Sequence, residues 1–343
     1  MEPLFEKTFV PADLIKAYPP RFQDLNKQVA FEVACPPDCS PSGSITFARY
    51  RSSSIPFSIS TSFDTVLELR EDIFGYEPRS GGSDTLEWYL NFANTDLFCA
   101  YGGRAFAQDE LQVMEHPALC ALREALVATS RGQLFTVERG EPTPIVIMGI
   151  ERRCEISTAP DNGAGRPKGL YGRLFSAASS EVVRRATRAI VPPTVSNILA
   201  IEAPANGEGQ YTLAQLNLIL STAYSGFRAA QIESSRHVAG KKKAVVIHTG
   251  FWGCGVYGND KVLMALLQLL AARLANLHGL VFHSVDPAGS EAYRRARSIL
   301  DSTLLPKGLF QRLLRFSPAE RTLADVIEQI QGMGFRWGKG DGN

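Results

Sequence analysis

The sequence predicts an α/β protein in which a mixed central sheet is flanked by helices. In the second half of the chain, short apolar segments typical of buried strands alternate with longer segments of helical pattern. One of the helical segments, residues 260–277, is apolar almost all round, which indicates a helix buried on several sides. No internal repeat or low-complexity tract divides the 343 residues, so we expect one layered core.

Residues 1–80 are expected to form an accessory region packed on a core domain of residues 81–335. Several prolines in residues 1–30 predict an irregular or helical lead-in. Two segments rich in β-forming residues follow, at 28–34 and 44–50, and the run "CPPDCSPSG" between them predicts a loop.

The first half of the core domain is expected to contain two strands and a helix. Residues 86–94 alternate between apolar and polar side chains and predict a strand. Residues 108–130 have a helical pattern that Pro117 breaks or kinks. The apolar run in residues 143–158 predicts a buried strand, and the Gly- and Pro-rich residues 159–169 predict a loop.

The second half repeats the pattern of strand and helix. Residues 197–204 are predicted to form a short apolar strand. Residues 212–237 are predicted to form a helix with an interruption near Gly226. Residues 244–250 have the continuous apolar character of a strand buried on both faces, and residues 279–286 form another short strand.

The chain is expected to end with two or three helices. The last would start at Ser317 as N-cap, with Pro318 at the first helical position and Glu320 completing a capping box. Residues 336–343, "RWGKGDGN", are expected to be a flexible tail.

Composition excludes several classes of function. A net charge of +1 gives no general electrostatic basis for binding nucleic acid or an anionic membrane, and no apolar run is long enough to span a bilayer. Six cysteines in a chain of this length do not form a disulfide scaffold, and Cys35 and Cys39 have no second pair at metal-ligand spacing. The N-terminus lacks a signal-peptide pattern. We expect no metal, no cofactor and a cytoplasmic location, or a host cytosol if the protein is a delivered bacterial effector.

The segment "HTGFWGCGVYGND" at residues 248–260 has four glycines among three large aromatic residues, between a strand and a helix. Glycine permits close approach of a ligand to the backbone, successive N–H groups can bind an anion, and the next helix adds its positive end. A phosphate or diphosphate site, with Trp252 and Tyr257 stacking on a sugar or base, is one interpretation. A packed turn with buried aromatics is the other, and Asn259 and Asp260 fit an N-cap role at least as well as a ligand role.

A second segment, "NFANTDLFCAYGGRAFAQDEL", ends with Gln108, Asp109 and Glu110 at the predicted start of a helix. Adjacent carboxylates there can simply complement the helix dipole. They can also transfer protons to a ligand held beside them. Composition alone favours the first interpretation.

The two segments together resemble the poly(ADP-ribose) glycohydrolase family. "HTGFWGCGVYGND" resembles that family's diphosphate-binding TGxWGCGxFGGD, and "NFAN" followed by "QDE" resembles its DFAN and catalytic QEE at the same spacing. "ILAIEA" and "AYSGF" resemble its IVAIDA and AYxGF, in the expected order over roughly residues 85–290. The resemblance implies a macrodomain-like three-layer core that binds ADP-ribose, with residues 1–80 as an N-terminal addition.

The resemblance also implies roles for residues. Glu110 would be the main acid and base of glycoside cleavage, with Asp109 as its partner. Asn91, Asn94 and Gln108 belong to the motifs and are expected to bind ADP-ribose. The backbone of the loop would hold the diphosphate, with Tyr257 against the distal ribose, and comprises Gly253, Cys254, Gly255, Val256, Tyr257 and Gly258.

The departures from the family pattern concern the bond that is cut. A triple glycine of the family is replaced here by "FCA" at residues 98–100, which puts hydrolysis of polymer in doubt. The altered loop and QDE are similar to the arginine-directed MavL-type branch, whose members remove mono-ADP-ribose from arginine, including arginine of ubiquitin. Asp96 and Asp109 are then candidates to pair with a guanidinium. Asp84 is a candidate for binding adenine, and Tyr171 for stacking on it.

We therefore expect an enzyme that removes ADP-ribose from a modified protein, with ubiquitin as one candidate partner and single units on arginine preferred over polymer. Cleavage of poly(ADP-ribose) and non-catalytic binding of ADP-ribose are the alternatives.

Overall fold

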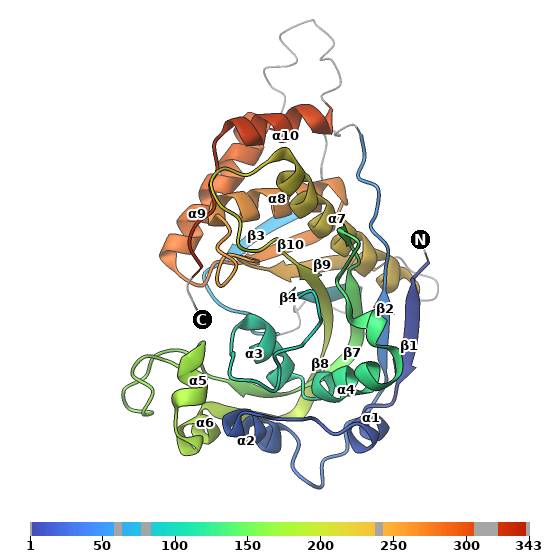
Figure 1. The fold of residues 1–343 in the computed structure, drawn as a ribbon, viewed down its shortest axis with the longest axis vertical. Coiled ribbons are helices and arrows are strands. Elements are labelled where there is room, and N and C mark those ends of the chain that lie inside the picture. The colour runs from blue at the N-terminus through green and yellow to red at the C-terminus, as the bar shows by residue number, and fades with distance from the viewer. Residues whose placement is uncertain (1, 58–63, 77–83, 237–242, 305–321, 341–343) are drawn as a thin grey trace, which may run out of the picture.

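A mixed sheet of eight strands runs through the middle of the computed structural model, which describes residues 2–57, 64–76, 84–236, 243–304 and 322–340 (Figure 1). The strands, in order across the sheet, are β1 (Phe5–Phe9), β2 (Ile45–Arg49), β7 (Ile145–Ile156), β8 (Thr187–Glu202), β4 (Thr85–Ala93), β9 (Ala244–Thr249), β10 (Gly279–His283) and β3 (Val66–Arg70). The first four pair antiparallel, and the pairs from β8 to β3 are parallel. The predicted mixed sheet is confirmed.

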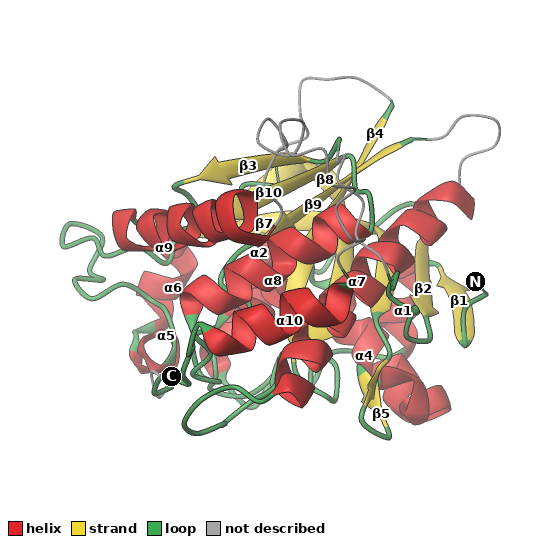
Figure 2. Cartoon of the chain, turned by 90° about the horizontal axis from the view of Figure 1, so that it is seen from above, coloured by secondary structure: helices red, strands yellow, loops and turns green. Residues whose placement is uncertain are grey.

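Helices cover both faces of this sheet (Figure 1 and Figure 2). One layer contains α7 (Leu213–Arg236), α8 (Lys261–Leu274), α9 (Pro287–Ser298) and α10 (Leu323–Gly332). The other contains α1 (Pro11–Ala17), α2 (Leu25–Ala34), α3 (Gln108–Glu115), α4 (Ala118–Ser130), α5 (Arg173–Ala177) and α6 (Ser180–Ala186). Short elements complete the chain: a 3₁₀ turn at Arg131–Leu134, a hairpin of β5 (Val137–Glu138) and β6 (Glu141–Pro142), and a π-helical turn at Ile299–Leu304. Among the described helices, none is both long and apolar enough to cross a bilayer.

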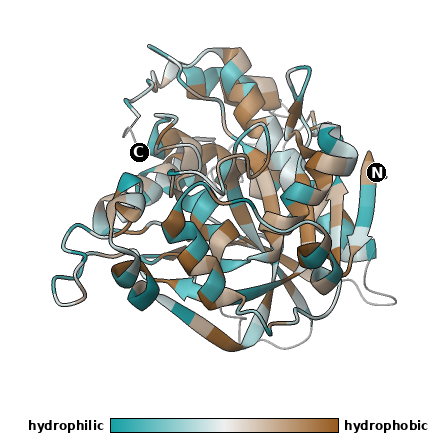
Figure 3. Ribbon diagram, turned by 60° about the horizontal axis from the view of Figure 1, so that its bottom comes forward, coloured by the Kyte–Doolittle hydropathy of each residue, from teal (hydrophilic) through white to brown (hydrophobic). Residues whose placement is uncertain are grey.

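The alternation of side chains along β4 explains the two layers. Trp88 and Leu90 point into the core beneath α7 and α8, whereas Tyr89 and Ala93 point into the core beneath α3 and α4. The central strands are accordingly rich in hydrophobic residues (Figure 3), whose buried side chains belong to the cores on both faces. Asn91 occupies the α3 side of β4 and is fully buried there, so it needs a polar partner inside the protein.

The N-terminal region differs from the prediction at three elements: the lead-in contains the strand β1, the strand β3 was not predicted, and a predicted strand is a helix. Residues 28–34 lie in the helix α2 and not in a strand; Asp24 caps this helix by accepting a hydrogen bond from the backbone N–H of Asn26 at 2.8 Å. The predicted strand at 44–50 is present as β2. Through β1 and β2 on one side and β3 on the other, residues 1–80 supply both edges of the sheet.

Most later elements agree with the prediction. Pro117 does separate two helices, α3 and α4. Helix α7 is continuous, so the interruption expected near Gly226 is wrong: a Cβ on this glycine would lie 2.9 Å from Ile201 Cγ2, and the glycine serves close packing of α7 on β8. The helix start expected at Ser317 lies outside the described residues, and α10 begins after the N-cap Thr322.

Candidate active site

The two segments singled out in the sequence follow neighbouring parallel strands. The loop that leads to α3 follows β4, and the glycine-rich loop that leads to α8 follows β9. Because parallel strands end at the same edge of a sheet, both loops meet at this edge, where ligands bind in open α/β sheets.

Gln108 fastens the start of α3 to β4. Its Oε1 accepts a hydrogen bond from the backbone N–H of Phe92 at 2.8 Å, and its Nε2 donates to the carbonyl of Leu90 at 3.0 Å. Its own backbone N–H donates to the phenol of Tyr171 at 3.2 Å. Both polar ends of the side chain thus bind the strand, and Tyr171, which is partly exposed, lies beside the helix start.

Asp109 is a buried carboxylic acid with a perturbed pKa. Its Oδ1 accepts a hydrogen bond from Asn91 Nδ2 at 3.0 Å, which supplies the partner that the buried Asn91 requires. Burial, followed by the negative charge of Glu110, raises the pKa of Asp109 from 3.8 to about 7, against the effects of Asn91, Lys27 and Arg123. Asp109 is therefore partly protonated near neutral pH.

Glu110 adjoins Asp109 and is also buried. One of its oxygens, Oε2, accepts a hydrogen bond from the backbone N–H of Ala107 at 2.8 Å, which completes the first turn of α3. The capping interpretation of these residues is therefore correct for Glu110. It does not exclude chemistry, because Glu110 lies beside Asp109, a buried carboxyl whose pKa is raised into the range of a group that exchanges protons near neutral pH.

The glycine-rich loop requires glycine at specific positions. Gly253 and Gly258 have φ of +73° and +72°, and a Cβ on Gly253 would lie 2.4 Å from the Cβ of Ala203. Trp252 is fully buried and donates to the carbonyl of Ile201 at 3.1 Å, so stacking of Trp252 on a ligand is wrong.

The other side chains of the loop fix its connection to α8. Asp260 caps the helix by accepting from the backbone N–H of Leu263 at 2.8 Å. Asn259 donates to the carbonyls of Gly253 and Pro204 at 2.9 and 2.8 Å. Cys254 is partly buried, and its Sγ lies 3.6 Å from the carbonyl of Trp252.

The loop presents backbone donors on its outer side. Within the described ranges, the N–H groups of Gly255, Val256 and Tyr257 have no hydrogen-bond acceptor. They precede α8, whose N-terminal end carries the positive pole of the helix dipole. Such a row of N–H groups suits a phosphate or diphosphate.

The two halves of the site meet at Tyr257 and Asn94. The Tyr257 phenol accepts a hydrogen bond from Asn94 Nδ2 at 3.2 Å, and burial raises the pKa of this phenol. Next to Asn94, the hydroxyl of Thr95 donates to the carboxylate of Glu202, at the end of β8. The sequence analysis did not single out Glu202, although an acidic residue at the end of a predicted strand was a signal for it.

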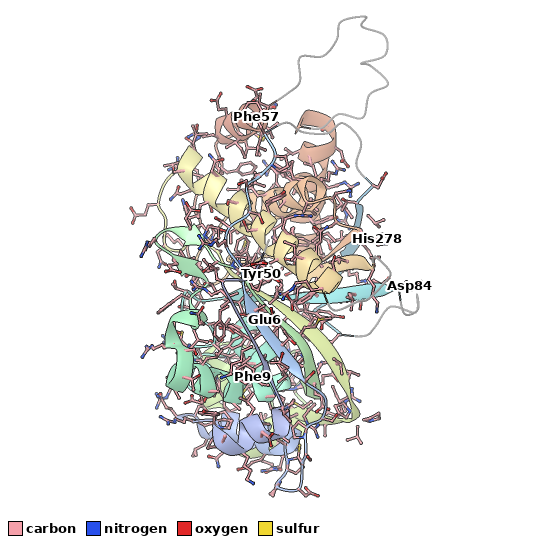
Figure 4. The ribbon with its side chains drawn as sticks, turned by 90° about the vertical axis from the view of Figure 1, so that its right-hand side faces the viewer. Glu6, Phe9, Tyr50, Phe57, Asp84 and His278 are labelled. Atoms are coloured by element: carbon pink, nitrogen blue, oxygen red, sulfur yellow. The ribbon has the colours of Figure 1, made fainter. Side chains whose placement is uncertain are left out.

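Four predicted site residues lie elsewhere or are already engaged. The side chains of Asn91 and Gln108 are bound within the protein, as described above, rather than free for ADP-ribose. Asp84 is exposed at the start of β4 (Figure 4), whereas the site is at the end of that strand, roughly 30 Å away at about 3.3 Å per residue. Its expected contact with adenine is therefore wrong. Asp96 is bound by both terminal nitrogens of Arg123, with Nη2 to Oδ2 at 3.0 Å, so the guanidinium that it holds belongs to the chain itself.

The end of the chain packs on the glycine-rich loop, up to the last described residue. Trp337 stacks on Tyr211, with ring centroids 4.5 Å apart, and the N–H of Gly338 donates to the carbonyl of Gly258 at 2.8 Å. A Cβ on Gly340 would lie 2.3 Å from the carbonyl oxygen of Val256. Residues 336–340, expected to belong to a flexible tail, therefore cover one side of the loop.

No group of three or more His, Cys, Asp or Glu is placed to hold a metal ion in the part of the chain that the structure describes. The side chains gathered at the site are suited to hydrogen bonding and proton transfer.

Comparison with known proteins agrees with this geometry. Residues 88–290, more than half of the chain, match the model of a family described as poly(ADP-ribose) glycohydrolase, macro domain fold. A probable poly(ADP-ribose) glycohydrolase 2 of Arabidopsis thaliana is 24% identical over 244 residues, which cover 61% of this chain and 42% of the plant protein. This chain thus matches less than half the length of that relative.

Solved structures are similar at lower identity. The poly(ADP-ribose) glycohydrolase of Thermomonospora curvata has 16% identity and a TM-score of 0.44, with 85% of each chain covered. That of Deinococcus radiodurans in complex with ADP-ribose has 17% identity and a TM-score of 0.43, with 86% of this chain and 95% of the other covered.

Proposed function

Because the chain belongs to the poly(ADP-ribose) glycohydrolase family with the macro domain fold, we propose that it is a hydrolase that binds ADP-ribose and cleaves the glycosidic bond at its distal ribose. The observation that carries this proposal is the contact between Asn94 and Tyr257, which brings an anion-binding loop and a buried acid pair to one place. An ADP-ribose unit has a charged diphosphate and a distal ribose whose glycosidic bond is cleaved. The glycine-rich loop suits the diphosphate, and the pair Asp109 and Glu110 suits the distal ribose.

The diphosphate would bind the N–H groups of Gly255, Val256 and Tyr257, which have no acceptor in the described residues. The ring of Tyr257 would then lie against the distal ribose. Its phenol, held by Asn94, would direct the sugar toward α3.

The acid pair Asp109 and Glu110 would carry the proton transfers. As the ribosyl carbon loses its bond to the leaving group, a protonated carboxyl gives its proton to the leaving atom. The carboxylate so formed then takes a proton from water while the water oxygen bonds to the ribosyl carbon. A pKa of about 7 for Asp109 suits a group that must hold and release a proton near neutrality, so Asp109 shares this role with Glu110.

We propose mono-ADP-ribosyl-arginine as the preferred substrate, with arginine of ubiquitin as one candidate. The support is the loop at Phe98–Ala100, where side chains replace the family's triple glycine. Phe98 is fully buried with φ of +58°, and Cys99 is exposed, with a pKa that is raised by burial and then by the nearby Asp109. A loop with side chains leaves less room for the second ribose of a polymer. Asp109, rather than Asp96, is the carboxylate available to a guanidinium.

Poly(ADP-ribose) hydrolysis is the second candidate, and the names of the family and of the plant relative favour it. A panel of substrates separates the two: mono-ADP-ribose linked to arginine, serine and glutamate, and polymer, each with wild type, Glu110→Gln and Asp109→Asn. We expect release of ADP-ribose from arginine by wild type, and loss of turnover with retained ADP-ribose binding in both variants. Preference for polymer would replace the arginine proposal. Tight ADP-ribose binding without turnover on any linkage would indicate a binding module.

A further inference from the structure

Helix α2 brings a lysine into the candidate site from outside the segment that matches the family. Lys27 lies in the first turn of α2 and is fully buried, whereas the family match begins at residue 88. Fully buried lysines are rare unless a partner balances the charge. Among the described residues, however, no carboxylate oxygen lies within 4.0 Å of the Lys27 ammonium.

The ammonium of Lys27 binds the altered loop directly. Its Nζ donates to the carbonyl of Ala100 at 3.1 Å, the last of the three residues that replace the triple glycine. The ring of Phe106 lies beneath it, with the centroid 5.9 Å from Nζ, at the limit of a cation–π contact. The ammonium of Lys27 thus contacts the loop that connects β4 to α3 near its middle, at Ala100, and near its end, at Phe106.

The residues before Lys27 fasten the same loop. The backbone N–H groups of Gln23 and Asp24 both donate to the carbonyl of Gly102, at 2.8 and 3.1 Å. The N–H of Arg21 donates to the phenol of Tyr101 at 2.7 Å. A Cβ on Gly102 would lie 2.3 Å from the carbonyl oxygen of Arg21, so the two backbones are in direct contact. Residues 21–27 therefore bind the loop through several hydrogen bonds and hold it in place.

Lys27 also affects the pKa of Asp109 through its charge. Lys27 and Arg123 both lower the pKa of Asp109, but Arg123 is already bound to Asp96. Lys27 is bound to a neutral carbonyl, and among the described residues no carboxylate contacts its ammonium directly. Burial lowers the pKa of Lys27, and the nearby carboxylates of Glu110 and Asp109 act in the opposite direction. The titratable groups that face Lys27 are Glu110, Asp109, Cys120 and Asp24, and those that face Asp109 include Glu110, Lys27, Arg123, Cys99 and Tyr257.

We propose that Lys27 is a positioning residue of this site, which holds the loop at Phe98–Ala100 through Ala100 and places a buried positive charge beside that loop. Its importance for turnover rests on the proposed function, but its effect on Asp109 does not. Without Lys27, burial and the neighbouring Glu110 raise the pKa of Asp109, and of the three groups that lower it only Asn91 and Arg123 remain.

The test measures the ionisation of Asp109 independently of turnover. Protein labelled with ¹³C at aspartate Cγ is titrated by NMR, and the Asp109 signal is assigned by its absence in Asp109→Asn. Wild type is compared with Lys27→Met, which removes the charge at similar length, and with Lys27→Arg, which keeps it. Lys16→Met, at an exposed lysine of α1, is the matched control. If Lys27→Met does not fold, Lys27→Gln takes its place, because the amide can still donate to Ala100.

We expect the midpoint of Asp109 to rise by at least one pH unit in Lys27→Met and to return to within half a unit of wild type in Lys27→Arg. On the best substrate of the panel, Lys27→Met should lower kcat at pH 7 at least tenfold, with KM changed less than threefold. An unchanged Asp109 midpoint overturns the proposal, even if the variant is less stable or binds substrate less well. If wild type hydrolyses none of the substrates, the proposed function fails, and a shifted midpoint still establishes the influence of Lys27 on Asp109.

Discussion

The phenol of Tyr257 accepts a hydrogen bond from the side-chain amide of Asn94 at 3.2 Å, and this contact joins two loops that lie more than 150 residues apart in the chain. Asn94 directly follows the strand that leads to the acid pair, and Tyr257 belongs to the loop whose N–H groups have no acceptor among the described residues. A ligand that binds both loops therefore meets one continuous surface.

Removal of the phenol tests whether this contact organises the site. Tyr257→Phe keeps the ring but leaves Asn94 Nδ2 without its acceptor, so we expect weaker ADP-ribose binding by about 0.5–1.5 kcal/mol, or roughly two- to twelvefold in Kd. Calorimetry with ADP-ribose measures this. Tyr18→Phe, on a segment of the chain remote from both loops in sequence, is the control, and an equal loss there would argue against a specific role for the contact.

The glycine at 253 should be essential for space as well as for backbone conformation. Gly253→Ala adds a Cβ where Ala203 and Asn259 lie 2.4 and 2.9 Å away, so we expect a loss of roughly 2–4 kcal/mol in unfolding free energy. Gly140→Ala is the matched control: its φ is +82°, but its added Cβ meets nothing within 4 Å, so a loss of only about 1 kcal/mol is expected. Urea unfolding of both variants separates steric conflict from backbone strain, and equal losses would contradict the steric explanation.

The stacking of Trp337 on Tyr211 should stabilise the loop from its outer side. Trp337→Ala removes the stacked ring, and we expect a loss of about 1–3 kcal/mol in unfolding free energy together with weaker ADP-ribose binding. Binding is affected because Tyr211 also bonds Asn259, which supports the loop. Lys339→Ala, an exposed side chain two residues away, should change neither quantity. Loss of stability with unchanged affinity would limit the segment to a structural role.

The raised pKa of Asp109 makes stability depend on pH in a defined direction. Between pH 3.8 and about 7 the Asp109 carboxyl keeps its proton in the folded protein but loses it in the unfolded chain. Burial of Asp109 therefore lowers the unfolding free energy fully above this pH window and not at all below it. Asp109→Asn removes this loss of stability. The unfolding free energy of the variant relative to wild type should therefore increase from pH 4.5 to pH 8 by at most about 4 kcal/mol. Urea unfolding at both pH values checks this. Asp13→Asn, on exposed α1, is the control, and an advantage that is equal at both pH values would show that Asp109 is ionised throughout.

His116 should act in the opposite direction, at acid pH. Its ring is fully buried, its Nδ1 lies 2.8 Å from the carbonyl of Gln112, and burial lowers its pKa from 6.5 to about 3. As pH falls through this window the unfolded chain binds a proton that the folded protein does not, so stability is lost. His116→Gln should reduce that loss by up to about 3 kcal/mol at pH 4. The exposed His278→Gln is the control, and identical acid unfolding curves for wild type and His116→Gln would disprove the role of His116.

The local features of the site were predictable from the sequence, because they depend on neighbouring residues. The strand, glycine-rich loop and helix around residues 244–274 form as expected, since glycine spacing and the N-cap Asp260 act within a few positions. The helix α2 was predicted as a strand, because a short apolar run such as "QVAFEVA" has no decisive periodicity and its cap, Asp24, lies several residues upstream.

The long-range features were not predictable. Asp84 lies near "NFAN" in sequence, but β4 separates the two in space. Asp84 lies at the beginning of this strand and "NFAN" lies at its end. The pairing of Asp96 with Arg123, and the burial of Lys27 beside the acid pair, depend on helices that meet only in the folded chain. A lysine in a helix ordinarily faces solvent, so nothing in the sequence marks this one as buried.

The position of β3 at the edge of the sheet has a consequence for how the protein is made. Its neighbour in the sheet is β10, and Val66 pairs with Gly279, which the ribosome adds about 210 residues later. During synthesis this segment therefore leaves the ribosome long before its partner exists, while β2 awaits β7 for only about 100 residues. The nascent chain must keep an unpaired strand from associating with other chains for most of its translation, and co-expression of a holdase chaperone is expected to raise the soluble yield.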